Sequence, residues 1–86
     1  MDSRQLGRYK ISHALLEDEP RTALHITRHT IPVRAEYLYA ENCIEYVALS
    51  DNFRKLAIGG IPPYYNVIIR HNDEGGVAEI TFEEEA

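Results

Sequence analysis

Two histidines, His25 and His29, have the spacing that a metal site can use. On a helix, an H-x-x-x-H pattern places both imidazoles on one face, where a zinc ion can bind. In a strand, the same spacing separates the two Cα atoms by about 13 Å, too far for one ion. The threonine and isoleucine content of residues 21–31 favours a strand, and no third ligand is near in the sequence. We therefore expect no metal, no cofactor and a solvated histidine pair.

Ser12, His13 and Asp18 supply the groups of a hydrolase triad. The context of such a triad is missing, because no G-x-S-x-G elbow is present and adjacent strand residues point to opposite faces. The only cysteine, Cys43, begins an apolar run, which predicts a buried and inert thiol. Neither pattern indicates catalysis, and we expect a protein that is not an enzyme.

Tyrosine is the dominant aromatic residue, with six copies against two phenylalanines and no tryptophan. Tyrosine-rich surfaces occur in protein interfaces and also in platforms that stack nucleic-acid bases. A stacking platform needs a basic groove, yet Glu36, Glu41 and Glu45 lie among Tyr37, Tyr39 and Tyr46. We therefore expect these tyrosines in a protein interface or in the core, and we do not expect nucleic acid. The candidate binding residues are Tyr37, Tyr39, Tyr64 and Tyr65, with Arg28, His29 and Arg34 as contacts for an anion.

The negative charge is confined to one end of the chain. The formal charge is −5, residues 71–86 alone contribute −6, and residues 1–70 therefore sum to +1. We interpret 83–86 as a short acidic tail. Its glutamates, Glu83, Glu84 and Glu85, either keep a small protein soluble or contact a basic partner.

The length and composition favour one small soluble domain over residues 1–86. No apolar run approaches the ~20 residues of a membrane span, and residues 1–8 lack the apolar core of a signal peptide. One cysteine cannot form an internal disulfide, which fits a cytoplasmic location. Small domains without disulfides or metals often oligomerise, so we expect a homo-oligomer.

Alternating apolar residues predict strands at 33–39 and 43–49 and a hairpin formed by 64–70 and 77–83. In that hairpin we pair Arg70 with Val77, which places Tyr65 opposite Phe82. Residues 21–31 are predicted as a further strand, and 3–16 suit either a strand or a helix. Residues 50–52 suit a turn or the start of a short helical turn over 53–56, and 59–63 a loop.

The predicted fold class is mainly β. We expect a small antiparallel sheet, in a sandwich or open barrel of about five or six strands, with at most one or two short helices. The predicted function is that of a non-enzymatic binding protein acting through protein–protein contact. Its composition suits accessory or inhibitor proteins of phages and mobile elements. The alternatives are an oligomeric protein that binds or sequesters a small nucleotide-like anion and, as the third choice, a small enzyme.

Overall fold

The computed structural model describes residues 4–85 and consists mainly of strands. This confirms the predicted mainly β class with two short helices. No helix in the described part of the chain is long and apolar enough to cross a membrane. In chain order, the elements are β1 (Gln5–Ser12), α1 (His13–Asp18), α2 (Pro20–Arg28), β2 (Ile31–Leu38), β3 (Cys43–Ser50), β4 (Tyr65–His71) and β5 (Val77–Glu84).

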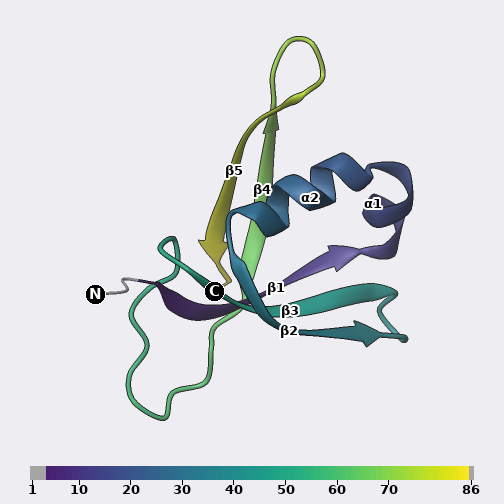
Figure 1. Cartoon of the computed structure of the whole chain (residues 1–86). Helices are drawn as coiled ribbons and strands as arrows, with labels where there is room; N and C mark the ends of the chain where they lie inside the picture. Colours follow the sequence, from purple (N-terminus) through teal and green to yellow (C-terminus); the bar gives the residue numbers. More distant parts are fainter. Residues whose placement is uncertain (1–3, 86) are drawn as a thin grey trace.

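The five strands form two antiparallel sheets rather than one. The first sheet has the order β1-β3-β2, and the second is the β4–β5 hairpin. Figure 1 shows the hairpin standing across the first sheet, with α2 lying over that sheet beside the hairpin. The two sheets meet at Arg8, whose backbone N–H donates to the Pro63 carbonyl at 2.8 Å and which forms a parallel bridge with Tyr64.

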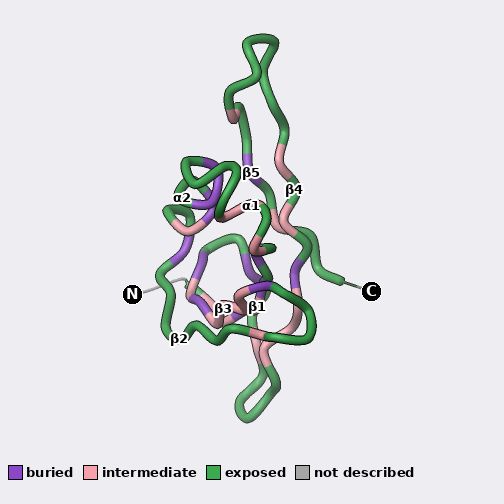
Figure 2. The backbone as a smooth tube through the Cα atoms, turned by 90° about the vertical axis from the view of Figure 1, so that its right-hand side faces the viewer, coloured by how far each residue is buried: buried purple, intermediate pink, exposed green. Residues whose placement is uncertain are grey.

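The core fills the space between α2, the inner face of the first sheet and the base of the hairpin. Figure 2 shows the buried positions gathered there, while β2 and the tip of the hairpin are exposed. β1 and β3 supply residues that alternate along each strand, as one buried sheet face requires. The cluster consists of Tyr9, Ile11, Ala23, Ile26, Ala48, Phe53, Tyr65 and Ile80.

The N-terminal segment is first a strand and then a helix. β1 ends at Ser12, whose Oγ accepts a hydrogen bond from the Leu15 N–H at 3.1 Å. This side chain satisfies one of the free N–H groups in the first turn of α1 and fixes where that helix begins. Ser12 therefore has a structural role as a helix cap, and the His13 side chain bonds Glu17 one turn further on.

The prediction of a strand over residues 21–31 is wrong, because most of this segment forms α2. Pro20 occupies the first turn, where its fixed φ favours a helix and its missing N–H has no cost. Thr22, Ala23 and Ile26 are buried on one face of the helix, so tertiary packing overrides the weak strand preference of threonine and isoleucine.

The two histidines are consequently not separated along a strand. His25 lies in α2, and His29 is the residue that ends it. The geometric reason for rejecting the H-x-x-x-H pattern is therefore wrong. Among residues 4–85, no group of three or more His, Cys, Asp or Glu side chains is placed to hold a metal ion.

The hairpin is confirmed, but its predicted register is wrong by two residues. Tyr65 pairs with Glu84 instead of Phe82, and Arg70 pairs with Glu79 instead of Val77. A shift of two keeps every side chain on its predicted face. A bulge between Arg70 and His71 and a turn closed by the Asn72 side chain account for the extra residues.

β3 is the central strand of its sheet, as its two apolar faces predicted. Ala48 on its inner face is fully buried, whereas Val47 and Leu49 on the outer face are half-buried. The segment after β3 turns at Ser50 without forming the short helix considered for residues 53–56.

Replacement of Gly7 by alanine should destabilise the fold. A Cβ at this position would lie 2.6 Å from Cδ2 of Phe53 and 2.8 Å from Cε2 of Tyr65. Because both rings are buried, overpacking should lower the free energy of unfolding by about 1–3 kcal/mol, measured by urea denaturation. The cost should shrink in a Phe53→Ala background, where one of the two rings is removed. Equal stability of Gly7→Ala and the native chain would contradict the packing described above.

Tyr9 should make stability fall at high pH. Its hydroxyl bonds Thr30 Oγ1 at 2.8 Å in the core, and burial raises its pKa above the ordinary 10.0. Above pH 10, the unfolded chain loses this proton while the folded chain keeps it, so folding becomes less favourable by up to about 1.4 kcal/mol per pH unit.

The variant Tyr9→Phe tests this pH dependence. It should cost about 1 kcal/mol at pH 7, because the hydrogen bond is lost. Between pH 8 and pH 11 it should lose less stability than the native chain, measured by urea unfolding at each pH. Parallel pH profiles for the two proteins would contradict the prediction.

Candidate protein-interaction surface

β2 is an edge strand with an open side. It is the last strand in the order β1-β3-β2, every residue from Ile31 to Tyr37 is exposed, and Leu38 is half-buried. One side of its backbone pairs with β3, and no described strand pairs with the other side. Unpaired N–H and C=O groups along a strand edge can accept another strand.

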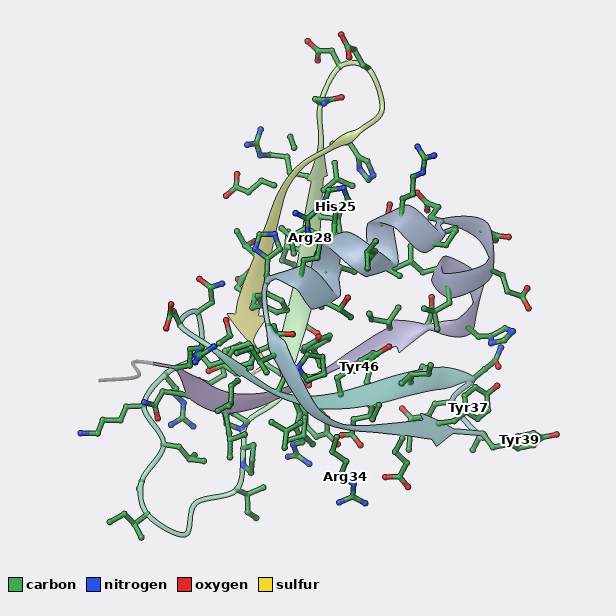
Figure 3. All side chains as sticks on the ribbon, in the orientation of Figure 1. His25, Arg28, Arg34, Tyr37, Tyr39 and Tyr46 are labelled. Atoms are coloured by element: carbon green, nitrogen blue, oxygen red, sulfur yellow. The ribbon has the colours of Figure 1, made fainter. Side chains whose placement is uncertain are left out.

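Large apolar side chains are concentrated on and just beyond this strand. The exposed fractions are 44% for Ile31, 59% for Val33, 47% for Tyr37 and 88% for Tyr39. Figure 3 shows Tyr37 and Tyr39 at the far end of β2, with Tyr39 pointing away from the molecule. These side chains follow the edge strand on both faces of the sheet, because Ile31 pairs with Leu49 of the outer face and Tyr37 with Ile44 of the inner face. Several exposed apolar groups along one edge are typical of an interaction site.

The aromatic end of β2 is held in place by its neighbours. The Tyr37 ring makes edge contacts with His13 (6.2 Å between centroids) and with Tyr39 (6.4 Å). The Tyr37 hydroxyl donates to Asn42 Oδ1 at 2.6 Å, and Asn42 adopts a positive φ of 52° in the β2–β3 turn. An aromatic side chain that is already ordered loses little conformational entropy when a partner binds.

Arg34 and Glu36 lie side by side on the outer face of β2. Their partners across the sheet are Val47 and Glu45, respectively, so Glu36 faces a like charge. The guanidinium and carboxylate are 3.7 Å apart, with side chains 72% and 56% exposed. Such an exposed pair contributes little to stability, and both charges remain accessible to a partner.

The other candidate tyrosines do not join this surface. Tyr65 is buried, stacks on Phe53 with centroids 4.4 Å apart, and its hydroxyl accepts from the Arg54 N–H at 2.8 Å. Tyr46 stacks on Tyr9 at 5.2 Å. The tyrosines that could have formed one stacking platform are therefore divided among the core, the sheet junction and the end of β2; they are Tyr37, Tyr39, Tyr46, Tyr64 and Tyr65.

Tyr64 has a structural role at the junction of the two sheets. The Arg8 guanidinium carbon lies 3.8 Å from the centre of its ring, and Arg8 Nε donates to the Pro62 carbonyl at 2.7 Å. A hydrogen bond to Glu45 and, to a smaller extent, burial raise the pKa of the Tyr64 hydroxyl. These contacts fix the end of the 59–63 loop on β1, which fits a connection to β4.

Arg28 and His29 lie together in a different place from Arg34. They line a hollow of about 360 Å³ with Arg4, Ser50 and Asp51 among its other walls. Ser50 Oγ donates to the His29 carbonyl at 3.3 Å, which ties the end of α2 to the end of β3. In Figure 3, Arg28 lies on α2 while Arg34 projects from the opposite side of the sheet. The structure thus separates the predicted anion contacts into two locations.

The acidic residues at the C-terminal end belong largely to β5. The strand extends through Glu84, so the assignment of residues 83–86 to a tail is corrected for its first two residues. Glu84 Oε1 accepts from Arg54 Nε, and the Glu85 backbone N–H donates to the Tyr64 carbonyl at 2.9 Å. Glu83 and Glu85 are exposed.

Three surface residues were missed as candidates from the sequence, although the segment carries a signal for them. Ile31, Val33 and Glu36 are also exposed on β2. A proline at position 32 together with charges of both signs is typical of an edge strand. An edge assignment for 31–38 would therefore have identified all three.

Comparisons with known protein families, with curated proteins and with solved structures found no match.

Proposed function

We propose that this protein is a non-enzymatic binding protein that acts through protein–protein contact at the β2 surface. We define the β2 surface as Ile31, Val33, Arg34, Glu36, Tyr37 and Tyr39. The observation that carries the proposal is the combination of an open strand edge with exposed apolar and aromatic side chains on the same strand.

The open backbone edge and the exposed side chains of this surface contribute to binding in different ways. An open edge supplies affinity through backbone hydrogen bonds with an added strand, and side chains on that edge supply specificity. Tyrosine contributes a large ring with a polar group, and it is enriched in protein interfaces for that reason. The Tyr37 ring contacts His13 and Tyr39, and its hydroxyl bonds Asn42, which supports a preformed position for this ring.

We further propose a cytoplasmic location and a role of the accessory or inhibitor type. The buried free thiol of Cys43 suits a reducing compartment such as the cytoplasm. There the protein would act as an accessory or inhibitor protein of the phage or mobile-element type that its composition suggests.

Loss of apolar groups from the β2 surface should abolish capture of the partner. The variant Val33→Ser/Tyr39→Ser removes two exposed side chains and should change the stability by no more than about 0.5 kcal/mol. The measurement is affinity capture from a lysate of the source cells, with mass spectrometry of the retained proteins. We expect a protein that the native chain retains and that this variant does not.

The matched control is Ile58→Ser/Ile61→Ser, which changes two exposed apolar residues in the β3–β4 connection. This control should retain the same protein as the native chain. Equal retention by the β2 variant, or a native chain that retains no protein at all, neither a different protein nor a second copy of itself, would contradict the proposal.

A second candidate function, binding of a small anion, is favoured by one observation. The hollow at the end of α2 is lined by Arg28 and His29, with Arg4 and the acidic Asp51 among its other walls. Positive groups around a concave polar site are the usual means of binding phosphate-containing ligands.

The anion site predicts stabilisation by ligand. Pyrophosphate or a nucleotide at about 100 times its dissociation constant should add about 2.7 kcal/mol, which raises the melting temperature by several degrees. Arg28→Gln should remove this shift, while Arg21→Gln, in the first turns of the same helix, should keep it. Thermal denaturation checks both variants, and the absence of any shift in the native protein would reject this function.

A further inference from the structure

We propose that the partner of the β2 edge is a second copy of this chain, joined by antiparallel pairing of β2 with β2 about a two-fold axis at Ala35. This inference rests on the proposed function, because it assigns a partner to the same β2 surface. The pairing would join the two three-stranded sheets into one sheet of six strands.

The charges on β2 are self-complementary in this register. A two-fold axis at residue 35 places Arg34 of each copy directly opposite Glu36 of the other. Both residues lie on the outer face of the sheet and are exposed, so neither must be uncovered before pairing. Side chains directly opposite across an antiparallel pair have Cβ atoms about 5 Å apart, within reach of an ion pair. Two equivalent ion pairs follow from the symmetry.

The apolar residues also match in this register. Ala35 meets its own copy at the axis, where a small side chain lets the two backbones approach. Tyr37 of each copy comes next to Val33 of the other, which is the extra residue of the β-bulge on β2. An aromatic residue opposite a β-branched one is a favourable cross-strand pair. The regularly paired residues 34–36 of each strand therefore find a suitable neighbour at every position, and the bulge at Val33 marks the end of the regular stretch.

This register is favoured because the registers shifted by one or two residues on either side of it are unfavourable. A shift of one residue would turn the outward face of one strand toward the inward face of the other. A shift that moved the axis from residue 35 to residue 34 or 36 would place Arg34 against Arg34 or Glu36 against Glu36. Like charges directly opposite destabilise a strand pair.

The rest of the fold leaves room for this arrangement. A two-fold axis perpendicular to the sheet keeps α2 of both copies on one face and leaves the outer faces continuous. Figure 2 shows β2 exposed along its length at the side of the molecule away from the hairpin. Glu45 lies next to Glu36 on β3, but it bonds Tyr64 and lies 3.9 Å from Arg8. It therefore does not compete with Glu36 for Arg34 of the partner copy.

Charge reversal gives a sharp test of the pairing. The native chain should show a mass approaching twice 9.9 kDa by sedimentation at high micromolar concentration. In Arg34→Glu, both ion pairs become pairs of carboxylates, and in Glu36→Arg, both become pairs of guanidinium groups. Each variant should weaken the dimer by about tenfold or more.

The two variants should then bind each other. When they are mixed, one chain is acidic at both positions and the other is basic at both, so both cross-strand pairs again have opposite charges. A one-to-one heterodimer of native strength is expected from the mixture, and the double variant Arg34→Glu/Glu36→Arg should form its own dimer. Tagging one chain with a fluorophore allows the heterodimer to be titrated directly.

Two control variants separate this effect from a change in net charge. Arg21→Glu on α2 and Glu74→Arg at the hairpin tip change the formal charge by the same amounts at exposed sites outside β2, and both should dimerise like the native chain. A monomeric native chain, or a dimer that persists in both single variants, would overturn the inference, as would two monomeric variants that do not associate when mixed.

The capture experiment distinguishes failure of this inference from failure of the proposed function. A monomeric native chain that captures a different protein through β2 would overturn the second copy as partner and leave the β2 surface as a binding site. A dimer with the expected charge dependence would support the second copy whatever else the lysate yields.

Discussion

The absence of a side chain at Gly7 is the constraint on which the arrangement of the two sheets depends. Phe53 and Tyr65 stack on each other directly over this glycine, and a Cβ there would lie 2.6 Å from the nearer ring. Because the rings can reach the backbone of β1, the base of the hairpin packs on the first sheet. The contacts between Arg8 and residues 62–64 add polar bonds at the same junction. Without this close approach, the hairpin would be a two-stranded ribbon, which is marginal in water.

The strands were predictable from the sequence because their apolar and polar side chains alternate. The assignment of side chains to faces stays correct even when the predicted register is wrong by two residues. β3 and the faces of the hairpin follow from the period of two alone. α2 was not predicted, because its threonine and isoleucine content pointed to a strand, whereas Pro20 and the spacing of Ala23 and Ile26 were the better signals. The hairpin register depends on a bulge and on side-chain bonds in the turn, which alternation does not encode.

The candidate site was predictable to a smaller extent. Tyr37, Tyr39 and Arg34 lie on or beside one strand, so their proximity follows from local structure. Tyr64 and Tyr65 are next to each other in the sequence, yet their surroundings are set by β1 and Phe53, which are far away along the chain. Long-range packing of this kind has no local signature, and exposure of a tyrosine cannot be inferred from its sequence neighbours.

β2 combines features that discourage pairing with unrelated strands and features that allow a specific partner to bind. Pro32, the bulge that follows it and exposed charges are devices that discourage pairing with arbitrary strands. Charges of opposite sign two residues apart repel misaligned copies but attract one aligned copy, so the same residues can provide both protection and selectivity. Since β2 gives the core no buried residue, its side chains are largely free of the packing constraints that govern Tyr9 or Ala48. Selection for binding can therefore act on this strand with little effect on the stability of the fold.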